Sequence, residues 1–230
     1  MRKTSLAAVR DTSKMLLHAV PLECNNPFGI VQHPFTNTMF SMSVDRKLLD
    51  LSHTEDRDIW LKNTEYTITH SNVDFIFHYL NTPWLLTWLK FNKNNLSPKD
   101  FAKYLAIAWV SSENPNDDKN VPIRTLVSWF RNVDKRVLMQ PDDYKYYQSL
   151  PNEVTLYRGV SPGRKKYGLS WTDDVNTAQW FKQRFEEDGN KGELLTVTVP
   201  KEYCLCYFNT RGEKEIILDV YKAKAKIKTM

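Results

Sequence analysis

Apolar residues recur at helical spacing through the middle of the chain. Val73, Ile76, Phe77 and Leu80 stand at positions i, i+3, i+4 and i+7, which places them on one face of a helix. The same spacing recurs in two further sets, Phe101, Tyr104, Leu105 and Ala108, and Ile123, Leu126, Val127 and Phe130. We therefore predict that residues 73–150 are largely helical and that these stripes pack in a core.

Capping and turn residues divide this region into separate helices. Ser97 precedes Pro98, an order typical of a helix start, with serine as the N-cap and proline at the first helical position. Pro122 and Pro141 predict two further starts, and the polar segment 113–119 predicts a loop.

The first 72 residues are polar, mixed and only weakly periodic. Pro21, Pro27 and Pro34 interrupt them and add turn character. Short strands are predicted at Gly29–His33 and Met39–Val44.

The pattern changes after Pro151. Runs rich in Val, Ile, Tyr and Leu predict strands at 154–157, 194–199, 203–208 and 215–221. Between the first two, Thr172-Asp173-Asp174 opens a helix with an apolar face of Val175, Ala178, Phe181 and Phe185, ended by Gly189 and Gly192. This order of elements is α+β. We therefore distinguish an N-terminal, mostly helical region, residues 1–150, from a C-terminal region, residues 151–230, which form two domains or share one continuous core.

Composition places the chain among globular proteins. It has 230 residues, of which 41% are hydrophobic and 26% charged, and its net charge is +5. This mild excess of positive charge favours an acidic partner or a phosphate-bearing ligand, and it is too weak to argue for nucleic acid alone. No window has the apolar length of a membrane span and residues 1–20 lack the apolar run of a signal peptide, so we expect a cytoplasmic protein without membrane association.

The cysteines do not predict a disulfide framework or a metal site. There are three, Cys24, Cys204 and Cys206, and an odd number leaves at least one without a partner. Cys204 and Cys206 lack the second pair of ligands that a zinc site requires. We interpret the cysteines as small apolar residues of a reduced protein.

Three short segments of the C-terminal region carry the candidate chemistry. They are Tyr157-Arg158-Gly159 at the end of a strand, Ser170-Trp171-Thr172 just before a helix, and Glu213-Lys214-Glu215 at the start of a strand. Each has an ordinary structural interpretation when it is taken alone: a salt-bridging arginine, a helix cap and a pair of solvated carboxylates.

In this order, the three segments resemble the arginine–serine–glutamate class of ADP-ribosyltransferases, over about residues 151–222. The resemblance implies a split β-sandwich of two small sheets with a flanking helix. It also implies an NAD-dependent enzyme that moves ADP-ribose to a protein side chain. A glutamate at position 213 goes with arginine as the acceptor. The chain is also similar in general organisation to bacterial and phage proteins with such a C-terminal region, so an effector role is expected.

The resemblance assigns a role to each residue. Glu215 stabilises the positive charge that develops on the ribose when the bond to nicotinamide breaks. Glu213 engages the incoming guanidinium, and Ser170 holds the geometry. The predicted catalytic residues are Glu215, Glu213 and Ser170, and the predicted NAD-binding residues are Arg158, Tyr157, Gly159, Ser170, Trp171 and Thr172. Arg158 suits this task because its planar fork can clamp a diphosphate or ribose, whereas Trp171 stacks on nicotinamide or lies in the core.

Other functions stay open at this stage. An enzyme of the same fold could hydrolyse NAD or modify a nucleic acid, because the acceptor site lies in loops. A non-catalytic protein could use the same fold to bind and inhibit a partner. A nucleic-acid-binding module ranks last, since it rests on charge and aromatic residues alone.

Overall fold

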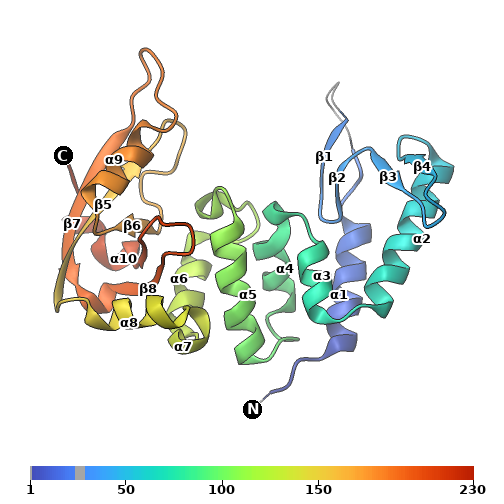
Figure 1. The fold of residues 1–230 in the computed structure, drawn as a ribbon, viewed down its shortest axis with the longest axis horizontal. Helices are drawn as coiled ribbons and strands as arrows, with labels where there is room; N and C mark the ends of the chain where they lie inside the picture. Colours follow the sequence, from blue (N-terminus) through green and yellow to red (C-terminus); the bar gives the residue numbers. More distant parts are fainter. Residues whose placement is uncertain (1, 24–28) are drawn as a thin grey trace. The chain divides into compact units, whose positions relative to one another are not determined.

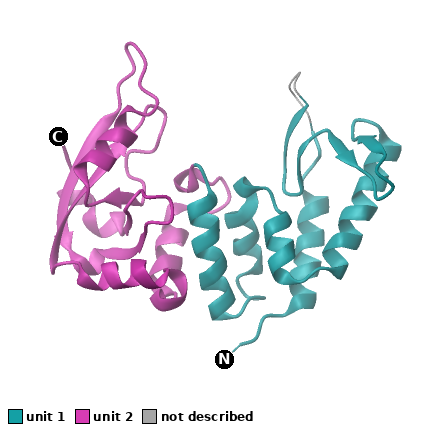
Figure 2. Ribbon diagram, in the orientation of Figure 1, with its two compact units in different colours: residues 1–113 teal, residues 114–230 magenta. Residues whose placement is uncertain are grey.

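The computed structural model describes residues 2–23 and 29–230, so Cys24 and Pro27 lie outside the described residues. The chain divides into two compact units, residues 1–113 and 114–230 (Figure 2). This boundary differs from the predicted one at residues 150 and 151. The helices that follow residue 114 pack against the C-terminal sheet, and they therefore belong to the second unit. Across the described part of the chain, no helix has the length and hydropathy that crossing a membrane would require.

In its described residues, unit 1 consists mainly of helices, accompanied by two short β-hairpins (Figure 1). Its helices are α1 (Leu6–Ala19), α2 (Thr54–His70), α3 (Val73–Tyr79), η1 (Thr82–Trp84), α4 (Leu85–Asn92) and α5 (Pro98–Ser111). Its strands are β1 (Ile30–His33), β2 (Thr36–Thr38), β3 (Phe40–Met42) and β4 (Leu48–Asp50). The predicted strands at 29–33 and 39–44 are confirmed as β1 and β3, and each pairs antiparallel with the strand that follows it.

Helices α1 and α2 are absent from the sequence prediction. In α1 the Ser5 side chain caps the first turn, and Val9, Ser13 and Leu16 are buried at helical spacing. The buried stripe includes the polar Ser13, which accepts a hydrogen bond from Trp88 Nε1 at 2.8 Å. A serine in the apolar stripe weakens the hydrophobic periodicity from which a helix is predicted.

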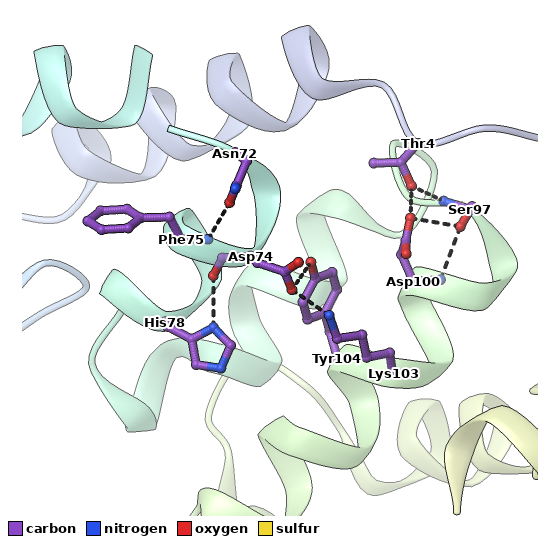
Figure 3. A network of polar contacts seen from close by, with 9 residues as sticks. All are labelled: Thr4, Asn72, Asp74, Phe75, His78, Ser97, Asp100, Lys103 and Tyr104. Carbon is purple, nitrogen blue, oxygen red and sulfur yellow. Dashed lines mark hydrogen bonds and ion pairs between the residues drawn. The ribbon is translucent and has the colours of Figure 1, made fainter. Parts of the chain in front are cut away.

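Polar side chains fix the starts of α3 and α5 and connect the two helices (Figure 3). The side chain of Asn72 accepts a hydrogen bond from the backbone N–H of Phe75 at 2.8 Å. Asp74 accepts from Lys103 Nζ at 2.5 Å and from the hydroxyl of Tyr104 at 2.8 Å. These two bonds lower the pKa of Asp74, Lys103 having the larger effect.

Ser97 caps α5 as predicted, because its side chain accepts the backbone N–H of Asp100 at 3.0 Å. Replacing Ser97 with alanine is expected to lower the free energy of unfolding by about 1 kcal/mol, the usual cost of a lost N-cap. Ser111→Ala, at the exposed far end of the same helix, is the matched control and should leave stability unchanged. Urea unfolding followed by circular dichroism measures both, and equal stability of the two variants would contradict the capping role.

Unit 2 places its helices around one antiparallel sheet (Figure 1). Its helices are η2 (Pro115–Asp117), α6 (Ile123–Asn132), α7 (Lys135–Leu138), α8 (Pro141–Ser149), α9 (Val175–Gln183), η3 (Lys201–Tyr203), α10 (Val220–Ala223) and η4 (Lys224–Lys226). Its strands are β5 (Glu153–Val160), β6 (Ser170–Thr172), β7 (Glu193–Pro200), β8 (Cys204–Phe208), β9 (Glu215–Leu218) and β10 (Lys228–Thr229). The α+β class is therefore confirmed at this coarse level.

The strands of unit 2 form one hydrogen-bonded sheet instead of the two small sheets expected. Its order is β10-β7-β5-β6-β9-β8, and the short β6 joins its two halves. Strand β5 pairs with β7 along its whole length, but it pairs with β6 only at Tyr157 and Thr172. The expectation of two separate sheets is therefore wrong for the strand connectivity, because β6 bonds to a neighbour on each side.

Two predicted elements end earlier than expected. The strand predicted at 215–221 ends at Leu218, because the buried Asp219 side chain caps α10 and pairs with Arg131. The helix predicted to reach the glycines ends at Gln183, and Glu187 and Asn190 then form a tight hairpin turn.

Candidate active site

The three candidate segments lie on neighbouring strands of unit 2. Tyr157 on β5 is paired with Thr172 on β6, and Thr172 is paired with Glu215 on β9. Directly opposed residues of antiparallel strands project from the same face. The register therefore brings Tyr157, Thr172 and Glu215 into one row across the junction of the sheet, although 58 positions separate the first from the last in the sequence.

Arg158 is buried, with 8% of its surface exposed, and its guanidinium is bound to backbone oxygens. It donates to the carbonyls of Ser170 at 2.7 Å, Lys165 at 2.8 Å and Lys166 at 3.2 Å. Burial lowers the pKa of Arg158 to about 10, and the nearby Glu215 opposes that shift. The group therefore remains charged at neutral pH and ties the 161–168 loop to β6.

The lysines of this loop are ion-paired. Lys165 Nζ lies 2.6 Å from the carboxylate of Asp117, and Lys166 pairs with Glu193. A basic loop of this kind could attract the phosphates of NAD. Its two lysines instead pair with acidic residues of unit 2.

Asn116 belongs to this site, and the sequence analysis did not identify it. Its side-chain nitrogen donates to the Ser170 hydroxyl at 3.0 Å, and its oxygen accepts from the backbone N–H of Leu169 at 2.6 Å. Asn116 is buried, so these bonds are formed away from solvent and orient Ser170. A lone asparagine in the polar segment 113–119 has no periodicity or motif that would single it out.

The residues beside Ser170 have structural tasks. Trp171 is 2% exposed and its indole N–H donates to the Gly168 carbonyl at 3.0 Å, so of the two interpretations the structure supports the core. Thr172 is also buried, and its hydroxyl accepts the backbone N–H of Asp174 at 3.2 Å. Asp174 is the N-cap of α9, since it accepts the N–H groups of Asn176 and Thr177.

Glu213 and Glu215 are in different surroundings. Glu215 is half-buried at the start of β9, opposite Thr172, where its charge acts on Arg158. Glu213 lies before the strand and forms a 2.9 Å ion pair with Arg211. Lys214 between them has a positive φ of 48°, so the chain is not extended there. Carboxylates at i and i+2 share a face only where the backbone is extended, so strand geometry does not place Glu213 beside Glu215.

Gly159 lets α9 lie directly on β5. A side chain at this position would put its first carbon 2.0 Å from the Ala178 carbonyl oxygen and 2.4 Å from the Lys182 nitrogen. The requirement for glycine after Arg158 is therefore explained by close packing of helix on strand.

Gly168 is enclosed by the site itself. A methyl group there would lie 2.5 Å from a guanidinium nitrogen of Arg158 and 3.0 Å from Cγ of Asn116. Because hydrogen bonds hold both side chains, we expect Gly168→Ala to lower the free energy of unfolding by about 1–3 kcal/mol, the usual range for an overpacked site.

Thermal or urea unfolding tests this prediction. Gly163→Asn is the matched control in the same loop, since its φ of 76° is one that asparagine tolerates and no atom lies within 4 Å of the added carbon. If the two variants were equally stable, the close approach of the guanidinium to Gly168 would not affect the free energy of unfolding.

The site consists of Arg158, Ser170, Thr172 and Glu215, with Asn116 as a support. Among the described residues, no group of three or more His, Cys, Asp or Glu side chains is arranged to hold a metal ion. Cys204 and Cys206 are buried thiols, and burial raises the pKa of both. Comparison of the chain with protein-family models, with curated proteins and with solved structures finds no match, so the interpretation of the site rests on these residues.

Proposed function

We propose that the protein is an NAD-dependent mono-ADP-ribosyltransferase that modifies a protein side chain, with arginine as the acceptor. The observation that carries the proposal is the row across β5, β6 and β9. It places Glu215 opposite Thr172, while Arg158 binds the backbone of Ser170. A carboxylate and a hydroxyl residue from distant segments are thus paired across the sheet, and a guanidinium binds the same short strand. The reaction needs groups of these three kinds.

The chemistry requires a carboxylate beside the ribose. The bond between the ribose C1′ and the nicotinamide nitrogen breaks, and its electron pair leaves with neutral nicotinamide. The ribose then carries positive charge, which the half-buried Glu215 carboxylate stabilises more strongly than solvent would. A guanidinium nitrogen of the acceptor forms a new bond to C1′, and the proton it loses passes to solvent.

The remaining groups have supporting roles in this proposal. The Ser170 hydroxyl, oriented by Asn116, hydrogen-bonds the ribose or the glutamate. Arg158 is a positioning residue, because its hydrogen bonds hold the 161–168 loop and β6 together beside Glu215. This role differs from the direct clamp on the diphosphate that the sequence analysis expected.

Incubating the purified protein with labelled NAD and a cell lysate tests the proposal, with Glu215→Gln as the control. We expect label on a protein band with the wild type alone, and mass spectrometry of that band identifies the acceptor. Release of nicotinamide without labelled protein or nucleic acid would identify a glycohydrolase. If no nicotinamide is released and calorimetry detects no NAD binding, the catalytic proposal fails.

The fixed guanidinium also supports a second candidate, a protein that binds and inhibits a partner without catalysis. A structural arginine is what a binding scaffold would keep, because it stabilises the loop whether or not NAD binds. In that case Glu215→Gln would leave partner binding intact and no chemistry would be detected with either form.

A further inference from the structure

A pocket of about 470 Å³ lies beside the candidate site in unit 2. It is lined by Tyr146, Asp173, Asp174, Val175, Tyr207 and Lys214. The exposed ring of Tyr146 lies against the buried ring of Tyr207, with their centroids 4.4 Å apart and their planes at 33°. The hydroxyl of Tyr146 donates to the carboxylate of Asp173.

The pocket adjoins the row that contains Glu215. Asp173 directly follows Thr172 in the chain, and Lys214 directly precedes Glu215. Tyr207 is paired with Ile216, the residue after Glu215. Asp173 and Lys214 therefore flank Thr172 and Glu215 at the end of β6 and the start of β9. Tyr207 lines the pocket from the face of the sheet that carries Ile216.

The charge of the lining selects for a cation. Lys214 Nζ lies 2.7 Å from the carboxylate of Asp174, so these two charges compensate each other. Asp173 then gives the lining one net negative charge. Burial, followed by the charges of Asp173 and Asp143, raises the pKa of Tyr207 to about 12, so this ring is a neutral phenol near pH 7.

We propose that this pocket receives the cationic side chain of the acceptor, a guanidinium that contacts the exposed ring of Tyr146 and hydrogen-bonds Asp173. A cation over a tyrosine face is attracted by the ring, and a planar guanidinium also donates in a fork to a carboxylate. The acceptor role rests on the proposed transferase activity. The inference goes beyond it by assigning recognition of the acceptor to α8, β8 and the turn before α9 instead of to Glu213.

Two observations favour this occupant over the alternatives. Glu213 is not among the lining residues and is already paired with Arg211. The diphosphate of NAD is repelled by a lining of net negative charge, so the pocket does not suit that end of the dinucleotide. An acceptor arginine would meet both an aromatic surface and an uncompensated carboxylate.

The test is a titration of the full-length protein with L-arginine methyl ester, followed through the NMR signals of the tyrosine rings. Citrulline methyl ester, which has a neutral urea in place of the guanidinium, is the matched ligand. We expect saturable binding of the arginine ester alone. Asp173→Asn should weaken it about tenfold or more, as expected when a charged hydrogen-bond acceptor is lost.

Matched variants distinguish a loss of binding at the pocket from a loss of folding. Asp188→Asn removes an exposed carboxylate of the same unit and should leave the affinity unchanged. Tyr146→Phe keeps the ring and should retain most of the binding, whereas Tyr146→Leu should lose it, and circular dichroism should show all variants folded. Equal binding of both esters, no binding, or full affinity in Asp173→Asn would overturn the inference.

Nicotinamide release, measured on the same samples without acceptor, distinguishes failure of the acceptor pocket from failure of the proposed transferase activity. Release of nicotinamide from NAD together with no arginine binding would contradict the pocket assignment and remain consistent with the proposed chemistry. Arginine binding that depends on Asp173, together with no NAD cleavage, would leave a cation-binding pocket and remove the transferase.

Discussion

Glu215→Gln is expected to lower the rate of nicotinamide release from NAD by about 10²–10³-fold, the range found when one electrostatic contact to a transition state is removed. Glutamine keeps the size of the side chain and its hydrogen-bonding oxygen but carries no charge. The positive ribose would then lose its nearest counter-charge, in a half-buried place where solvent cannot fully replace it.

The loss should fall on kcat and leave KM nearly unchanged, because the charge on the ribose exists only in the transition state. Chromatographic measurement of nicotinamide at several NAD concentrations separates the two constants. Glu202→Gln is the matched control, since Glu202 is an exposed carboxylate in η3 of the same unit. Equal rates for the two variants would remove Glu215 from the chemistry, and a purely raised KM would assign it to binding.

The helices of the middle region could be predicted because their apolar stripes and caps are local. Ser97 and Pro98 specify the start of α5, and the stripe around Ile76 and Phe77 is buried as its spacing requires. Helix α1 could not be predicted in this way, because the polar Ser13 lies in its buried stripe. The Ser13 hydroxyl accepts a hydrogen bond from Trp88, which is 75 positions away. A buried polar group whose partner is distant in sequence leaves no local signal.

The candidate residues could be identified from the sequence, but their arrangement could not. Strand register depends on pairing between distant segments, so the row of Tyr157, Thr172 and Glu215 follows only from the folded sheet. The positive φ of Lys214 also escapes prediction, since a non-glycine residue seldom adopts it. That one residue breaks the alternation that would place Glu213 and Glu215 on the same face.

The domain boundary also could not be predicted from the local sequence pattern. Pro151 marks a real change from helices to strands, but the helices before it complete the second unit by packing on β8. A change in local pattern locates an element boundary. A domain boundary depends on which elements pack together. The apolar face of an amphipathic helix does not indicate which element it packs against.

Replacing Arg158 with methionine is expected to lower the free energy of unfolding by about 3 kcal/mol or more. The carbonyls of Lys165, Lys166 and Ser170 would lose their donor, at about 1 kcal/mol each. Methionine has similar length and flexibility, so the change isolates the hydrogen bonds and the charge from the loss of volume. Urea unfolding measures the effect, and Arg136→Met, at an exposed arginine of α7, is the control and should be neutral.

A lysine at position 158 separates a positioning arginine from one that binds NAD directly. Lysine keeps the charge but cannot reach three carbonyls with a rigid fork, so the loop should loosen. Trypsin would then cut at Lys165 and Lys166 faster in Arg158→Lys than in the wild type, and kcat would fall together with stability. If the loop stayed resistant and only the KM for NAD rose, the guanidinium would be acting on the dinucleotide itself. The three carbonyl bonds favour the first result, since a guanidinium already held by the backbone must give up those contacts to reach a phosphate.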